Sequence, residues 1–151
     1  MKSLTRFFQE NNTMDCMIPI IDGTSNISLR IIDWFVTNYS KKHNTRIISK
    51  STEAAHNAKQ FLVFLNYKSQ LKAYTKKQFD PFCRRGRISF YYNKQDRSKF
   101  IITTVGQLNF FRWAITNGIL DYIDENLEQI ETDMNTCIRT AYKKSGFHHT
   151  N

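Results

Sequence analysis

Apolar residues recur three or four positions apart in four parts of the chain, the spacing of a helix with one buried face. We predict helices at about residues 27–42, 69–78, 104–116 and 119–142. Asn26 or Ser28 suits the N-cap of the first helix, and Thr104 with Gln107 forms a capping-box pattern for the third. The fourth carries an apolar stripe from Ile119 onward and is expected to be one continuous, amphipathic C-terminal helix.

Shorter runs rich in β-branched and aromatic residues predict strands. Residues 45–49 form one such run, while the apolar run 61–65 is consistent with either a buried strand or a buried helix segment. Residues 87–92 and 99–103, joined by a polar loop, predict a β-hairpin. Alternation along its first strand directs Arg87, Ser89 and Tyr91 outward, with Ile88 and Phe90 toward the core.

These elements indicate an α+β fold, a single domain with a small, mostly antiparallel sheet packed by the predicted helices. The domain is expected to span residues 26–144. Residues 1–25 are assigned to an N-terminal arm, with two alternatives: it docks as a short extended segment, or it stays undocked. Residues 50–60 are expected to form a loop or a single helical turn, and residues 145–151 a flexible tail.

Cysteine and histidine positions give no sign of a metal site or cofactor. Cys16, Cys83 and Cys137 are far apart, and the four histidines do not stand at ligand spacing to any of them. Free thiols favour a reducing compartment. No apolar run approaches the length of about 20 residues that a membrane span needs, and the N-terminus lacks a signal-peptide pattern. We therefore expect no metal, no cofactor and no membrane partner.

The distribution of charge along the chain is more informative about function than the overall composition. Residues 41–112 contain 16 Lys and Arg against three acids, a formal charge of +13 in a chain whose net charge is +9. Residues 121–133 contain six acids and no base. A basic middle with Phe and Tyr threaded through it indicates a polyanion partner, most simply nucleic acid.

Basic and aromatic residues are most densely placed in the segment 72–99. Lys and Arg neutralise phosphates, Arg also grips phosphate oxygens or guanine edges, and exposed aromatic rings stack on unpaired bases. An alternative interpretation is a solvated hairpin whose aromatic rings pack inward. The candidate nucleic-acid-binding residues are Lys72, Lys76, Lys77, Arg84, Arg85, Arg87, Tyr91, Arg97, Lys99 and Arg112.

The helix at 104–116 has two interpretations. Gln107, Asn109 and Arg112 are plausible groove-facing donors, with Trp113 near the boundary of the core. The alternative is a core helix with an ordinary polar face. Cys83, beside Arg84 and Arg85, is expected to be a structural rather than a reactive thiol.

The acidic face of the helix at 119–142 has three interpretations. It is a solvated surface, a docking site for a basic partner such as the middle of another copy, or a surface that repels nucleic acid and so orients binding. The second interpretation includes self-association and contact with other proteins through this face.

The runs NYKSQLKAYTKKQFDPFCRRGRI and ITTVGQLNFFRWAITNGILDYI resemble a small protein family of nucleocytoplasmic large DNA viruses, over about residues 27–135. The resemblance implies a virus that replicates or assembles in cytoplasmic factories, and it brings no catalytic residue. A second resemblance is to KilA-N-type viral DNA-binding domains, whose order of residues is echoed by Thr104, Phe111, Trp113, Asn117 and Leu120.

Two functions are compatible with these features. The first is a non-enzymatic nucleic-acid-binding protein of a large DNA virus, acting in genome packaging or transcription, with DNA preferred over RNA. The alternative is a virion structural or scaffold protein that assembles through its basic middle and acidic helix. No His, Asp and Glu constellation indicates an enzyme. Either function places the protein in the host cytoplasm, in a viral factory, or in the virion.

Overall fold

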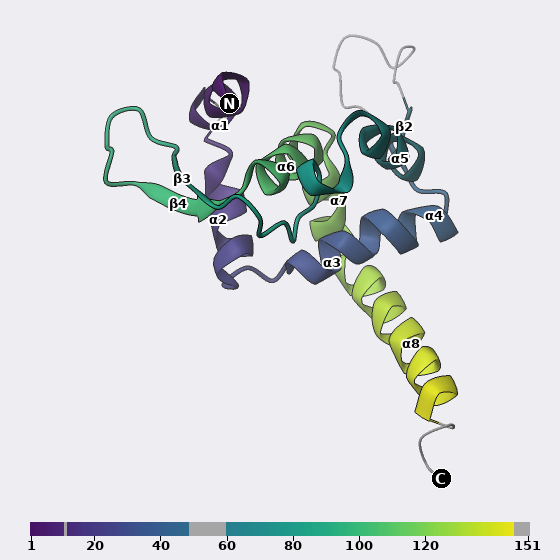
Figure 1. Ribbon diagram of the computed structural model, residues 1–151. Coiled ribbons are helices and arrows are strands. Elements are labelled where there is room, and N and C mark those ends of the chain that lie inside the picture. Colours follow the sequence, from purple (N-terminus) through teal and green to yellow (C-terminus); the bar gives the residue numbers. More distant parts are fainter. Residues whose placement is uncertain (11, 49–59, 147–151) are drawn as a thin grey trace.

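The computed structural model describes residues 1–10, 12–48 and 60–146 (Figure 1). Its strands are β1 (Arg46–Ile48), β2 (Gln60–Leu62), β3 (Ile88–Tyr91) and β4 (Phe100–Thr103). They form two separate antiparallel pairs, β1 with β2 and β3 with β4. The helical elements are α1 (Lys2–Glu10), α2 (Met14–Asp22), α3 (Leu29–Trp34), η1 (Phe35–Tyr39), α4 (Ser40–Lys42), α5 (Val63–Ala73), η2 (Lys76–Gln78), α6 (Val105–Thr116), α7 (Ile119–Glu125) and α8 (Leu127–Gly146). The α+β class and the β3–β4 hairpin are confirmed.

Helix α6 is the centre of the core (Figure 1). Most of its residues are buried, including Leu108, Phe111 and Ala114, which have no exposed surface. A helix that is apolar on most sides must be covered by other elements. The ring of Phe79 packs 5.2 Å from that of Phe110 and 5.4 Å from that of Trp113. Burying one such side chain contributes about 1.5–3 kcal/mol, so this cluster is a main source of stability.

The predicted helix at 27–42 is confirmed, with one local change. The Ser28 hydroxyl caps it by accepting a hydrogen bond of 3.1 Å from the Ile31 backbone N–H. Residues of η1 are π-helical instead of α-helical. Nearby, the Thr37 and Ser40 hydroxyls donate to backbone carbonyls four residues earlier, a contact that often bends helices. The helix therefore widens there without ending.

Residues 1–25 do not dock as an extended segment, and that alternative is wrong. They form α1 and α2, which bury Leu4, Phe8 and Met17. Leu4 and Phe8 are four positions apart and therefore share one helix face. The Phe8 ring meets the ring of Phe90 on β3 edge to face at 5.8 Å. The two helices thus contribute to the same core as residues 26–144 and support the hairpin.

The predicted helix at 69–78 is misplaced. Helix α5 begins at Val63 and ends at Ala73, and residues 76–78 form the short η2. Val63 and Tyr67 are buried at helical spacing, whereas Leu65 is largely exposed. The run 61–65 is therefore divided between the end of β2 and the start of α5 and is not a buried strand. The prediction for residues 50–60 lies almost wholly outside the described residues.

The single helix predicted at 119–142 is instead two helices, divided at Asn126. Its φ of −123° departs from the helical value, and its side-chain amide donates to the Tyr122 carbonyl at 2.9 Å. The apolar stripe is buried through Ile130 and Met134, beyond which α8 extends away from the other elements (Figure 1). Helix α8 continues to Gly146, and residues 147–151 of the predicted tail lie outside the described part.

Candidate nucleic-acid interface

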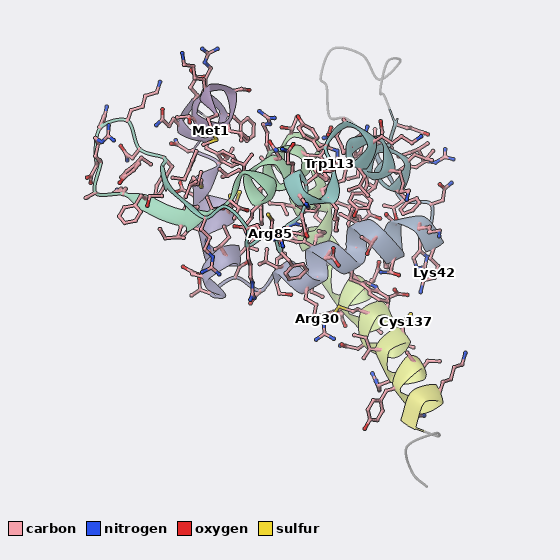
Figure 2. All side chains as sticks on the ribbon, in the orientation of Figure 1. Met1, Arg30, Lys42, Arg85, Trp113 and Cys137 are labelled. Carbon is pink, nitrogen blue, oxygen red and sulfur yellow. The ribbon has the colours of Figure 1, made fainter. Side chains whose placement is uncertain are left out.

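A basic loop, defined as residues 76–87, runs from η2 to the start of β3. Its Lys and Arg side chains are exposed, as expected from the sequence. Figure 2 shows Arg85 on this loop, in front of the core. The exposed positively charged residues of the loop are Lys76, Lys77, Arg84, Arg85 and Arg87.

Buried polar side chains hold the backbone of the basic loop against α6. The Gln107 amide donates to the Pro81 carbonyl at 2.7 Å, and the Asn109 amide donates to the Gln78 carbonyl at 2.9 Å. The Thr104 hydroxyl donates to the Cys83 carbonyl at 3.0 Å. Because buried backbone carbonyls need hydrogen-bond partners, these contacts fix the path of the loop.

The prediction that Gln107 and Asn109 face a nucleic-acid groove is therefore wrong. Both side chains are more than nine-tenths buried, and their amide nitrogens are taken by loop carbonyls. The Thr104 cap is confirmed, since its hydroxyl accepts from the Gln107 backbone N–H at 3.1 Å. The side-chain oxygen of Gln107, Oε1, accepts from the Thr103 hydroxyl. It therefore does not accept from the Thr104 backbone N–H, as a complete capping box requires.

Gly106 allows the basic loop to approach α6 closely. A Cβ at this position would come within 2.8 Å of the Lys77 carbonyl oxygen and 2.9 Å of the Cys83 Sγ. The Cys83 thiol itself donates to the Lys77 carbonyl at 3.3 Å. The Cys83 side chain thus packs between the backbone of its own loop and α6, which agrees with the structural role expected for it.

Lys76 differs from the other cations of the basic loop, because it has acidic and polar neighbours. Its Nζ is 3.9 Å from the Asp80 Oδ1 and 3.4 Å from the Tyr67 hydroxyl. Burial raises the pKa of Asp33 on α3, while the positive charge of Lys76 opposes that rise. Part of the positive charge of Lys76 is therefore balanced by carboxyl groups of the fold. Lys76 is for this reason a weaker candidate for phosphate contact than its neighbours.

The hairpin presents an aromatic platform, defined as Tyr91, Phe100 and Ile102, on its outer face. These side chains are 38%, 46% and 53% exposed. Tyr91 is paired with Phe100 across the strands, and their ring centroids are 5.4 Å apart. Phe90 points the other way and is buried. The predicted alternation is confirmed, and the hairpin therefore has one core face and one exposed face.

A cation lies directly over this platform. The guanidinium carbon of Arg97 is 5.1 Å from the ring centroid of Tyr91, a cation–π distance. Arg97 belongs to the turn between β3 and β4, where Lys94 and Lys99 are also exposed. Asp96 in the same turn accepts from Ser98, and these hydrogen bonds lower the pKa of its carboxyl group. The turn therefore has a defined shape held by its own side chains.

Sequence reasoning missed Phe100 and Ile102 as members of this surface. Phe100, Ile101 and Ile102 are all apolar, so their polarity does not mark the outward positions; only the alternation of side chains along a strand, applied to the second strand of the hairpin, assigns Phe100 and Ile102 to one face. By the same alternation Arg87, immediately before β3, belongs to the outer side of the hairpin. Exposed basic side chains and exposed aromatic rings thus follow one another from the basic loop into the platform.

Lys72 and Arg112 lie in a different part of the molecule. Arg112 is half-buried on α6, and its Nη1 donates to the Ser3 hydroxyl of α1 at 2.9 Å. Lys72 is exposed near the end of α5. Trp113 is buried, not at the boundary, and donates to the Asn66 side chain at 2.7 Å (Figure 2). The side-chain hydrogen bond of Arg112 is to α1 and not to the hairpin.

The acidic face of α7 and α8 is exposed except for Asp133. Asp133 accepts from the Trp34 indole at 3.0 Å and forms an ion pair with Lys42 at the end of α4. Burial acts to raise the pKa of Asp133, but the hydrogen bonds and the positive charges of Lys42 and His43 hold it below its ordinary value. Asp133 therefore docks α8 onto α3 and α4. The exposed acids are Asp121, Asp124, Glu125, Glu128 and Glu131.

Among the described residues, no helix is both long enough and apolar enough to span a membrane.

The chain belongs to a protein family of unknown function, DUF7197, whose family model matches residues 1–150. A relative in this class is the Uncharacterized protein L507 of Acanthamoeba polyphaga mimivirus, 46% identical over 131 residues. That match covers 85% of the chain and 49% of the relative, so the chain spans about half the length of the viral protein. No solved structure matches the chain. The expected resemblance to a family found in a large DNA virus is confirmed at this level.

Proposed function

We propose that this protein is a non-enzymatic nucleic-acid-binding protein that contacts phosphates through the basic loop and stacks bases on the aromatic platform. The observation that carries the proposal is the outer face of the hairpin, where Tyr91 and Phe100 lie exposed side by side beneath the Arg97 guanidinium. Exposed rings beside cations are the chemistry that binds unpaired bases and their backbone. The proposed context is genome packaging or transcription of a large DNA virus, in its cytoplasmic factory or in the virion.

Solvent exposure of the aromatic rings favours this function over a purely structural hairpin. Rings that served only the core would be covered, yet Tyr91 and Phe100 are 38% and 46% exposed. The inner face already supplies the packing, through Phe90 and its contact with Phe8. The outer rings are therefore available to a ligand. We propose DNA over RNA as the preferred ligand, and unpaired strands over duplex because stacking needs unpaired bases.

Replacing both rings tests the stacking contribution. The double variant Tyr91→Ala with Phe100→Ala should weaken binding to single-stranded DNA by about tenfold or more, because each stacked base contributes about 1–3 kcal/mol. Tyr142→Ala on α8 removes a still more exposed aromatic ring outside the hairpin and should leave affinity unchanged. The measurement is fluorescence anisotropy with labelled oligonucleotides. Equal affinities for the double variant and the Tyr142→Ala control would remove the platform from the binding site.

Replacing the arginines of the basic loop tests the phosphate contribution. The triple variant Arg84→Ala, Arg85→Ala, Arg87→Ala should weaken binding to every sequence and lower the log–log salt slope by about two to three, roughly one for each lost phosphate contact. The matched control removes three positive charges from α8 with Arg139→Ala, Lys143→Ala and Lys144→Ala. If both triple variants lose affinity equally, the effect is one of net charge and the basic loop is not the site.

The resemblance to KilA-N-type domains stays a prediction. It would give α6 a role in DNA contact, but Thr104, Phe111 and Trp113 are buried in this fold. The proposed interface therefore uses the hairpin and the basic loop rather than α6.

Assembly of virion proteins is the second candidate function, and the exposed acids of α7 and α8 favour it. These carboxylates offer a docking surface for the basic loop of a neighbouring copy. Sedimentation velocity across a salt series distinguishes the two functions. Self-association that salt disrupts, together with no affinity for DNA or RNA, would support assembly and contradict the nucleic-acid proposal.

A further inference from the structure

A cleft of about 360 Å³ lies between the hairpin turn and the junction of α1 with α2. Small-molecule sites have volumes of about 300–1,000 Å³, so this cleft is at the lower end of that range and suits one small ligand. It lies on the other face of the hairpin from the aromatic platform, because Tyr92 lines it together with Phe8, whereas Tyr91 is exposed on the outer face. The hairpin turn connects the two faces, since Lys94, Gln95 and Lys99 of the turn also line the cleft.

Amide side chains dominate the walls of the cleft. Gln9 comes from α1, Asn12 from the α1–α2 junction, and Asn93 and Gln95 from the hairpin turn. An amide group carries both a hydrogen-bond donor and an acceptor, which is the combination that pairs with the edge of a nucleobase. Four amides from three segments of the chain thus surround one small volume.

Contacts within the fold orient two of these amides. Gln9 Nε2 donates to the Tyr91 carbonyl at 3.1 Å, which leaves Oε1 available as an acceptor. Asn93 Oδ1 accepts from the backbone N–H groups of Gln95 and Asp96, which leaves Nδ2 available as a donor. These contacts hold two of the amides that line the cleft in one orientation each. Asn12 and Gln95 are exposed and line the same cleft.

The charges around the cleft are divided between its walls. Lys94 and Lys99 line the hairpin side, whereas Asp15 lines the α2 side. A ligand with a phosphate group would place it toward the lysines, away from the Asp15 carboxylate. The Tyr92 ring supplies an aromatic surface for a planar group.

We infer that this cleft holds one unstacked nucleotide, with the base against the amides and Tyr92 and the phosphate beside Lys94 and Lys99. The inference rests on the proposed function and deepens it. A single strand that stacks on the platform would have to pass around the hairpin turn to place a later nucleotide in the cleft, and in that path the platform supplies affinity and the cleft supplies preference among bases.

Paired amide substitutions test the cleft. The probes are labelled homopolymers of thymine, adenine or cytosine deoxynucleotides, each about ten nucleotides long, close to one single-strand site. The natural chain should prefer one homopolymer by about tenfold, as expected for one good base contact. Asn12→Ala with Gln95→Ala should reduce that preference to about twofold without changing the salt slope. The matched control, Gln129→Ala with Asn135→Ala on the exposed side of α8, should keep it.

Failure of the cleft and failure of the proposed function give different results. If the homopolymers bind and the Asn12→Ala, Gln95→Ala variant keeps the full preference, the cleft proposal is overturned while nucleic-acid binding stands. If no homopolymer binds, the proposed function fails, and nuclear magnetic resonance of the side-chain amides decides about the cleft. Shifts of the Gln9 and Asn93 amides on titration with the four deoxynucleoside 5′-monophosphates would support a nucleotide site. No shift beyond that of Gln129 would overturn it.

Discussion

At the scale of single residues, a few buried polar groups determine the shape of an exposed surface. The side-chain amides of Gln107 and Asn109 donate hydrogen bonds to backbone carbonyls of the basic loop, and Gly106 lets the loop lie close to α6. None of the three carries a charge or faces a ligand. The arginines of the basic loop nevertheless depend on them, because a loop whose backbone is fixed presents its side chains in one arrangement.

Substitution at Gly106 should show how tightly the basic loop is packed. Gly106→Ala should lower the free energy of unfolding by about 1–3 kcal/mol, because the new Cβ would overlap the Lys77 carbonyl and the Cys83 Sγ. Urea denaturation measures the change. Adding Cys83→Ala removes one of the two overlaps and should recover part of the loss. The packing described here is wrong if Gly106→Ala is as stable as the natural chain, since alanine otherwise favours a helix.

The sequence does not disclose this role of the polar residues of α6. Gln107 and Asn109 look like surface donors because their partners are 26 and 31 positions away, in a loop whose path no local pattern describes. The exposed aromatic rings were easier to predict, because strand alternation is a local property and Tyr91 follows it. Phe100 and Ile102 follow the same rule. They would have been assigned to the outer face if alternation had also been applied to the second strand of the hairpin.

At the scale of elements, the sequence predicts the hairpin, the first long helix and α6 well, and the helix boundaries poorly. The division at Asn126 is invisible in the apolar stripe, which continues on both sides of it. The early start of α5 is hidden because an apolar run of five residues suits a strand or a helix equally well. In both cases tertiary packing selects between local alternatives of similar stability.

Asp133 gives the docking of α8 a dependence on pH. Its pKa lies below the ordinary aspartate value of about 3.9, so the ion pair and hydrogen bonds stabilise the fold above that pH and are lost as pH falls through the lower value. Asp133→Asn should reduce the free energy of unfolding at pH 7 by about 1 kcal/mol, with the difference shrinking below about pH 4. Urea titrations at several pH values measure this, with Asp124→Asn on the exposed acidic face as the control. A difference that is independent of pH would contradict the assignment.

At the scale of the whole molecule, positive and negative charge are separated. The basic hairpin turn and helix α8, whose first half carries Glu128, Glu131 and Asp133, extend in different directions from α6 (Figure 1). The same separation supports both proposed functions, because a basic surface attracts phosphates and an acidic surface either repels them or receives a basic partner. Affinity for nucleic acid and its dependence on salt therefore decide between the two functions more directly than any further structural detail.

The most direct measurement is the binding of the natural chain to labelled single-stranded DNA, duplex DNA and RNA, followed by fluorescence anisotropy across a salt series. We predict tightest binding to single-stranded DNA, with a log–log salt slope of several units from phosphate contacts made by the basic loop and the hairpin turn. No binding to any of the three at low salt would contradict the account and would leave the basic middle to protein partners.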